Sequence, residues 1–178
     1  VFLDFPVDTL RAHVSPAMQR PEWMIGQPRC TLHPDPVSID EAVDVLWSAK
    51  RPLVISGRGA KGAGPELVRL LDALDAVYLD TGESRGLVPD NHPAVVAAVR
   101  GAVMGEADVV LTVGRKLDFQ LAYGSPAVFG HAKFVRIAET VAELRDNRRG
   151  EAEVLASPGV ALQALVARAN GRAPATDK

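Results

Sequence analysis

Residues 51–93 contain the groups of this chain that are best suited to binding chemistry. Gly57, Gly59 and Gly62 spell G-x-G-x-x-G directly after a short apolar run, and Asp80 ends the next apolar run. Glycines in such a loop let the backbone approach a pyrophosphate, and a carboxylate about 20 residues further on accepts a hydrogen bond from a ribose hydroxyl. The pattern predicts a nucleotide-type ligand at this loop. The competing interpretation is a loop that only turns the chain, because the next helix is expected to begin after the third glycine.

Two further motifs in the same stretch are excluded by the residues that follow them. Residues 57–62 resemble the first half of a phosphate-binding P-loop, but Ala63 and Gly64 stand where that loop needs Lys and Ser or Thr. Residues 82–86 spell G-x-S-x-G, the nucleophile elbow of hydrolases, which needs a helix directly after the serine. The residues that follow are a poor start for a helix, so the serine is expected to be an ordinary loop residue.

Composition and charge exclude several classes of function. The 178 residues carry a formal net charge of −2, with 47% hydrophobic and 24% charged residues, as in ordinary soluble globular proteins. This charge gives no electrostatic reason to expect nucleic acid or an acidic membrane surface as a partner. No apolar run approaches the ~20 residues of a membrane helix, and no signal peptide is visible. The densest basic run, which holds Arg145, Arg148 and Arg149, is expected to face solvent.

No metal-binding pattern is visible in the sequence. The four histidines are scattered, and neither a cysteine pair nor a His-x-x-x-His spacing occurs. The single Cys30 excludes an internal disulfide and favours a reduced, cytoplasmic setting. We therefore expect no metal site in this chain.

Hydrophobic periodicity predicts alternating helices and strands that would position the glycine loop. Ser38 and Glu41 form a capping box at the start of a helix that runs to about Lys50. Further helices are expected after Pro65, over about 94–100 and around 160–166. Apolar runs predict strands at 53–56, 77–79, 108–114, 134–137 and 154–155. The expected fold class is α/β, a doubly wound parallel sheet of about five or six strands with helices on both faces.

In such a sheet, ligands bind beyond the carboxyl ends of the strands. The loops that follow the strands would therefore form the site, and they are residues 57–64, 80–86, 114–118 and 138–140.

The order of several segments in the chain resembles a known family. The segments VFLDFPVD, RPLVISGRGA, TGESRGLVPDNHP and EADVVLTVGRKLDF are similar to the central domain of thiamine-diphosphate-dependent enzymes. That family includes acetolactate synthases, benzaldehyde lyase-like carboligases, oxalyl-CoA decarboxylase and 2-oxoacid decarboxylases. The resemblance covers about residues 1–167 and implies a Rossmann-like sheet. It divides the chain into the end of a preceding pyrimidine-binding domain (1–13), a Pro-rich linker (14–37), the central domain (38–169) and a disordered tail (170–178).

The resemblance implies a three-domain parent enzyme, a homodimer or homotetramer, of which this chain is one part. Thiamine diphosphate is held between the first and third domains of neighbouring subunits, and a Gly-Asp-Gly…Asn motif of the third domain binds Mg²⁺. No Asp-Gly dipeptide occurs in this sequence. The chain is therefore expected to contain no catalytic residue and to be inactive alone, as a lyase or transferase fragment that contacts the parent's other domains.

Some members of the family hold FAD or ADP in the central domain. The positions that match such a site are Gly57, Arg58, Gly59, Thr81, Gly82, Gly114 and Arg115. A second group, Arg115, Asp118 and Phe119, lies in a loop that approaches the active site in some relatives, and packing between domains is the favoured role for it here.

Two departures from the nucleotide-binding pattern favour a structural domain with a vestigial cleft. Relatives that bind nucleotides carry Ile-Asp-x-Asp after the fourth strand, where this chain has Ala138 and Thr140, and Gly-Asp after the fifth, where it has Ala156 and Ser157. The alternative is an FAD-, ADP- or NAD-type binding module. A bulky residue at Gly59 is expected to abolish binding in such a module but to cost only loop strain in a structural domain.

Overall fold

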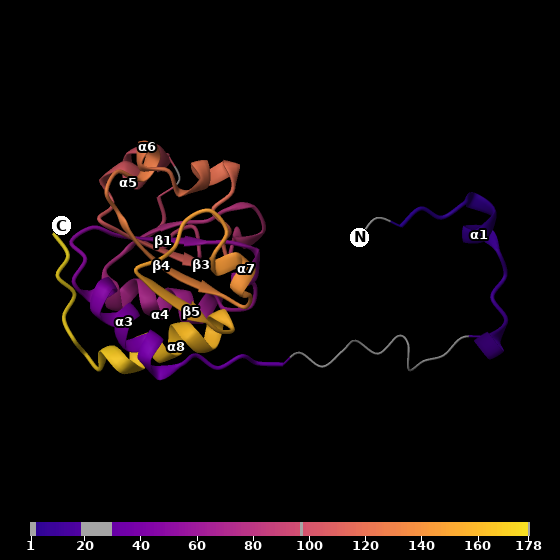
Figure 1. Ribbon diagram of the computed structural model, residues 1–178, viewed down its shortest axis with the longest axis horizontal. Coiled ribbons are helices and arrows are strands. Elements are labelled where there is room, and N and C mark those ends of the chain that lie inside the picture. Colours follow the sequence, from indigo (N-terminus) through magenta and orange to yellow (C-terminus); the bar gives the residue numbers. More distant parts are fainter. Residues whose placement is uncertain (1–2, 19–29, 97, 178) are drawn as a thin grey trace. The chain divides into compact units, whose positions relative to one another are not determined.

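The computed structural model describes residues 3–18, 30–96 and 98–177 (Figure 1). The chain divides into two compact units, 1–30 and 31–178. In the first unit, the described residues form a helix, α1 (Val7–Arg11), and a 3-10 turn, η1 (Pro16–Met18), and no residue of α1 is buried. Residues 3–6 are neither helix nor strand, and Val1 and Phe2 lie outside the described residues.

The second unit is built on a five-stranded sheet in which every strand pair is parallel. The strands are β1 (Pro52–Ser56), β2 (Val77–Leu79), β3 (Val109–Val113), β4 (Lys133–Ala138) and β5 (Ala152–Leu155). Their order across the sheet is β2-β1-β3-β4-β5, so the chain reverses its direction of winding between β2 and β3. The fold is the doubly wound, Rossmann-like α/β class that the sequence predicts.

Helices cover the two faces of this sheet unequally (Figure 1). One face carries three helices of 11 or 12 residues, α3 (Pro36–Trp47), α4 (Gly64–Leu74) and α8 (Pro158–Ala169). The other face carries only α5 (Arg100–Glu106), α6 (Pro126–Phe129) and the irregular turn η4 (Phe119–Gly124). Shorter elements follow three of the strands: η2 (Arg58–Ala60), η3 (Gly82–Ser84) and α7 (Val141–Leu144).

Alternate residues of β1, β2, β3 and β4 enter two separate apolar cores, as the pleat of a strand requires, whereas β5 contributes to the larger core alone. Val54, Leu111 and Ile137 pack with α3, α4 and α8 in the larger core. Leu53 and Val110 point the opposite way into the smaller core with Phe129 of α6. The smaller core therefore depends on two short helices and a turn for its cover.

Two helix starts differ from the sequence prediction. Asp35, not Ser38, caps α3, because its carboxylate accepts a hydrogen bond from the Ser38 backbone N–H at 3.1 Å. Pro36 then takes the first helical turn, where its missing N–H costs nothing. The helix expected over about 94–100 begins only at Arg100, because residues 94–96 hydrogen-bond to Tyr78 at the outer edge of β2.

The tail after α8, expected to be disordered, makes specific contacts over residues 170–177. The Arg172 carbonyl accepts a hydrogen bond from the indole N–H of the buried Trp47 at 3.0 Å, and the Arg172 guanidinium pairs with Asp44 at 2.9 Å. The Asp177 N–H donates to the Lys50 carbonyl at 2.9 Å. A buried indole N–H needs an acceptor, and the tail supplies it. None of the helices in the described part of the chain is long and apolar enough to cross a membrane.

Candidate functional site

The carboxyl ends of β1, β2 and β3 bring the residues of the predicted cleft together. The Gly57 N–H donates to the Val113 carbonyl and the Gly59 N–H to the Gly114 carbonyl, each at 3.0 Å. Arg58 forms an exposed ion pair with Glu83 at 3.3 Å, which links the loops after β1 and β2. This strand-end cluster comprises Gly57, Arg58, Gly59, Thr81, Gly82, Gly114 and Arg115.

Gly57, Gly59 and Gly114 are packed against the backbone of the neighbouring loop, whereas a Cβ atom on Gly82 would meet nothing within 4 Å. A Cβ atom on Gly59 would lie 2.8 Å from the Gly114 Cα, and one on Gly114 would lie 2.5 Å from the Gly59 Cα. Gly114 also has a φ of +53°, a conformation that glycine adopts at no steric cost. The glycine pattern thus has a structural cause inside the fold, namely the close packing of two loops.

Arg115 covers the first glycine of the motif. A Cβ atom on Gly57 would lie 2.7 Å from the Arg115 Cδ, so the side chain runs directly over this residue. The guanidinium donates two hydrogen bonds to Asp118, at 2.8 and 2.9 Å, and its side chain is only 10% exposed. The hydrogen bonds from Arg115 hold the pKa of Asp118 below its ordinary value. Arg115 is therefore already neutralised within the chain.

Four hydroxyl groups form hydrogen bonds with Ser56 or with one another where β1 and β2 end. The Ser56 and Tyr78 hydroxyls are 2.6 Å apart, and Thr81 donates to the Ser56 carbonyl at 2.6 Å. The Ser84 hydroxyl donates to the same carbonyl at 3.0 Å and accepts from the Thr81 N–H. Burial raises the pKa of Tyr78, so its phenol remains protonated. Ser84 is fully buried, and its side chain caps η3.

The acceptors that a nucleotide would need are engaged or missing. Asp80, the candidate partner of a ribose, lies between Arg85 at 3.4 Å and Arg100 at 3.8 Å. At the end of β4, Ala138 is buried and carries no polar group. After β5, the Ser157 hydroxyl accepts a hydrogen bond from the Leu32 N–H at 3.0 Å. The residues present do not fit FAD or ADP.

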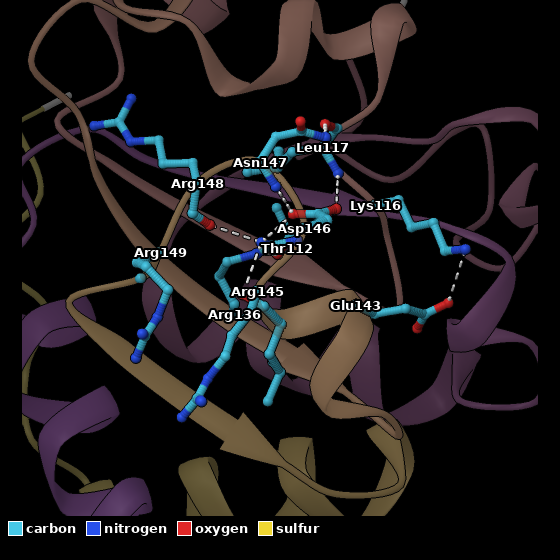
Figure 2. Close-up of polar contacts among 12 residues, drawn as sticks. Thr112, Lys116, Leu117, Arg136, Glu143, Arg145, Asp146, Asn147, Arg148 and Arg149 are labelled. Atoms are coloured by element: carbon cyan, nitrogen blue, oxygen red, sulfur yellow. Dashed lines mark hydrogen bonds and ion pairs between the residues drawn. The ribbon is translucent and has the colours of Figure 1, made fainter.

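A buried arginine that sequence reasoning missed organises the loops after β3 and β4. Arg136 is 1% exposed, and its Nη1 donates to Asp146 at 2.6 Å, to the Arg148 carbonyl at 2.8 Å and to the Leu144 carbonyl at 3.0 Å. Figure 2 shows these groups converging on the guanidinium. The available clue was a charged residue inside the apolar run 134–137, because buried charges require paired partners.

Asp146 connects this buried cation to the loop after β3. Its second carboxylate oxygen accepts from the Leu117 N–H at 2.7 Å, and Asn147 donates to the Leu117 carbonyl at 2.8 Å (Figure 2). Burial raises the pKa of Asp146, but the hydrogen bonds from Arg136, Asn147 and Leu117 outweigh it, so the pKa lies below its ordinary value.

The basic run of residues 145–149 does not all face solvent. Arg148 donates to the carbonyls of Gly124 and Ala132, at 2.7 and 2.8 Å, and its guanidinium carbon lies 4.4 Å from the centre of the Phe134 ring. Such a cation–π contact adds to the hydrogen bonds. Arg145 and Arg149 are exposed and pair with Glu153.

A cavity of about 310 Å³ lies at the opposite edge of the sheet, where β1 and β2 begin. Its lining includes Pro52, Leu53 and Val77, together with the exposed charges of Arg51 and Glu106. Among the described residues, no three His, Cys, Asp or Glu side chains are grouped so as to hold a metal ion.

Comparisons with known proteins agree with the geometry. Residues 39–165 match the model of the thiamine pyrophosphate enzyme central domain. Oxalyl-CoA decarboxylase of Escherichia coli (strain K12) is 29% identical in an alignment of 174 positions that covers 94% of this chain and 30% of that protein. The 2-hydroxyacyl-CoA lyase 1 of Mus musculus is 34% identical over 83% of the chain and 26% of its own length. The acetolactate synthase large subunit of Mycobacterium tuberculosis is 32% identical over 83% of the chain and 27% of its own length.

Solved structures show the same fold. The crystal structure of benzoylformate decarboxylase from Polynucleobacter necessarius superposes with a TM-score of 0.64 at 14% identity, covering 80% of this chain and 29% of that one. The sheet and its strand-end cluster thus define a Rossmann-like domain. The chain belongs to the family of thiamine pyrophosphate enzyme central domains, and it spans about 30% of the length of the curated relatives it matches.

The contact between Gly59 and Gly114 predicts that even a small side chain at either position destabilises the fold. From the sequence alone, a bulky residue at Gly59 of a structural domain was expected to cost only loop strain. Gly59→Ala forces a Cβ against backbone and is expected to lower the free energy of unfolding by about 2 kcal/mol, measured by urea denaturation without ligand. Gly101→Ala is the matched control, because a Cβ there meets open space and should be neutral or slightly stabilising in a helix. A Gly59→Ala protein as stable as the parent chain would contradict the packing role.

The Arg136–Asp146 pair predicts a pH-dependent loss of stability. Asp146→Asn leaves Arg136 buried without its counter-charge and should cost about 3 kcal/mol at neutral pH. The carboxylate's contribution is fully present above its unfolded pKa of about 3.9 and is lost as pH falls through its lower folded pKa. The difference between the two proteins in urea denaturation should therefore shrink below about pH 4.

Asp44→Asn is the matched control for this titration, because it removes an exposed carboxylate from a surface pair with Arg172. It should change stability by less than about 1 kcal/mol at any pH. A constant difference between Asp146→Asn and the unsubstituted chain down to about pH 2, well below the carboxyl range, would refute the ionic role of Asp146.

Proposed function

We propose that the chain is the structural, non-catalytic central domain of a thiamine-diphosphate-dependent lyase, carboligase or decarboxylase, with a vestigial nucleotide cleft. The observation that carries this proposal is that the charged side chains of the strand-end cluster are paired within the chain, although the buried Arg115 Nε has no hydrogen-bond partner. Gly57 and Gly59 pack against Gly114, Arg115 is paired with Asp118, and Asp80 lies between two arginines. Little remains in the cluster for a ligand to bind.

Family membership supports the placement of the chemistry elsewhere in the parent. The relatives are more than three times as long as this chain's match to them. When bound, thiamine diphosphate supplies the carbanion-stabilising ylid that cleaves or forms a bond next to a carbonyl carbon. We propose that this cofactor and Mg²⁺ bind to parts of the parent outside this chain, in a cytoplasmic homodimer or homotetramer.

The names of the relatives suggest which substrates to test first. Oxalyl-CoA decarboxylase and 2-hydroxyacyl-CoA lyase are both named for CoA thioesters, and acetolactate synthase for a hydroxy-oxoacid product. We therefore propose that a 2-oxoacyl- or 2-hydroxyacyl-CoA thioester is the parent's substrate class.

The test is an assay of the full-length parent with oxalyl-CoA, a 2-hydroxyacyl-CoA and pyruvate, with and without thiamine diphosphate and Mg²⁺. We expect turnover of a CoA thioester that requires the cofactor, and none by the isolated chain under the same conditions. Turnover by the isolated chain, or by a parent that does not need thiamine diphosphate, would overturn the proposal.

A thermal-shift measurement addresses the cleft directly. ADP, FAD, NAD and CoA should each leave the melting temperature of the chain unchanged, because the ribose and adenine acceptors are engaged or absent. A ligand present at about 100 times its Kd would instead add about 2.7 kcal/mol, a rise of several degrees. Should a shift occur, Asp80→Ala tells whether the ligand binds in the cleft. The substitution would abolish the shift caused by a nucleotide in the cleft and leave the shift caused by binding elsewhere unchanged. Such a shift would restore the nucleotide-binding alternative.

A further inference from the structure

The turn η4 exposes two aromatic side chains in a unit whose other aromatics are buried. Phe119 is 72% exposed and Tyr123 is 55% exposed. In the described part of residues 31–177, Trp47, Tyr78, Phe129 and Phe134 are each at most 2% exposed. Large aromatic side chains that face solvent at one place are typical of the central contacts of protein interfaces.

The backbone of this turn adopts a conformation that costs free energy. Ala122 has φ +45° and ψ +37°, and Tyr123 has φ +56° and ψ +24°, so two consecutive residues other than glycine are left-handed. This conformation is unfavourable for any residue that carries a Cβ atom. Strain of this kind persists only where surrounding contacts enforce it, and it is concentrated at functional sites.

The contacts that enforce the conformation come from both ends of the turn. The Asp118 carbonyl accepts from the N–H groups of Leu121 and Tyr123, at 3.0 and 2.9 Å, and Arg148 donates to the Gly124 carbonyl at 2.7 Å. Immediately before the turn, Leu117 is held by Asp146 of the buried arginine network (Figure 2). The two aromatics therefore project from a fixed base, and little conformational entropy is lost if they are covered.

The charges next to the turn indicate what kind of surface would cover it. Arg115 and Asp118 pair with each other, and Arg115 also donates to Gln120 at 2.9 Å. The formal charges within residues 115–125 include one more cation, Lys116, which pairs with Glu143 at 3.9 Å. The tip itself thus presents apolar aromatic surface without an unpaired charge, and an apolar recess is its complement.

We propose that Phe119 and Tyr123 form a preorganised docking element that inserts into an apolar recess on another domain of the parent polypeptide. The occupant is inferred from length: about 70% of an Escherichia coli relative lies outside its match to this chain, which covers 30% of it. This inference rests on the proposed function, in that it requires the chain to be one domain of a larger enzyme.

The test uses thiol labelling of the full-length parent. In a Cys30→Ser background, Phe119→Cys is treated with a maleimide in the native and in the urea-denatured parent. We expect position 119 to react at least about tenfold more slowly in the native parent, because docked anchors are fully desolvated. In the isolated native chain it should react as fast as in the denatured one. Equal rates in the native and denatured parent would overturn the proposal.

Two further measurements separate the outcomes. Tyr123→Asn places at position 123 a residue that tolerates the left-handed backbone, and it leaves Phe119 in place. This substitution should lower the melting temperature of the parent but not that of the isolated chain. If the isolated chain dimerises in sedimentation and Tyr123→Asn abolishes the dimer, the occupant is a second copy and the proposal is wrong. If position 119 is protected from maleimide in the parent but the parent has no thiamine-diphosphate-dependent activity, the proposed function is wrong and the docking proposal stands.

Discussion

The burial of one guanidinium determines how the carboxyl edge of the sheet is built. Arg136 lies on β4 and is fully buried, so its guanidinium would be strongly unfavourable without a counter-charge. Its hydrogen bonds reach Asp146 and two carbonyls of the loop after β4, and Asp146 in turn holds Leu117 in the loop after β3. The loop after β4 therefore cannot move without leaving a buried charge unpaired, and the loop after β3 is tied to it through Asp146. The aromatic turn and the strand-end cluster are both attached to these loops.

The unequal cover of the sheet gives the two faces different roles. Three full helices and the C-terminal tail close the larger core, so that face contributes most of the apolar burial. The smaller core is closed by α5, α6 and η4, which are too short to be stable without tertiary contacts. Polar contacts of Arg148 with Gly124, Ala132 and the Phe134 ring replace part of the missing helical cover. Apolar burial is thus greater on one face of the sheet, and the proposed docking element lies on the other.

The sequence predicted the strands well and their polar connections poorly. Five apolar runs became five strands, and the rule that parallel strands end at one edge brought Gly57, Thr81 and Gly114 together as expected. Periodicity reports only whether a position is buried, so it marked 134–137 as a strand but did not reveal that Arg136 pairs ten residues later with Asp146. The prediction of where α3 starts failed for a similar reason. Ser38 and Asp35 are both good caps, and only the path of the preceding chain decides between them.

The contact between Gly59 and Gly114 has a consequence for how such chains are recognised. Two loops whose backbones touch forbid any side chain at either position, whether or not a nucleotide was ever bound between them. Selection for folding alone would then preserve the first two glycines of the fingerprint, and motif searches would count them as evidence of a cofactor. The carboxylates beside the loops have no such protection, because replacing them with alanine or serine leaves the backbone contact intact. In domains of this type, those acidic positions indicate a functional nucleotide-binding site better than the glycines do.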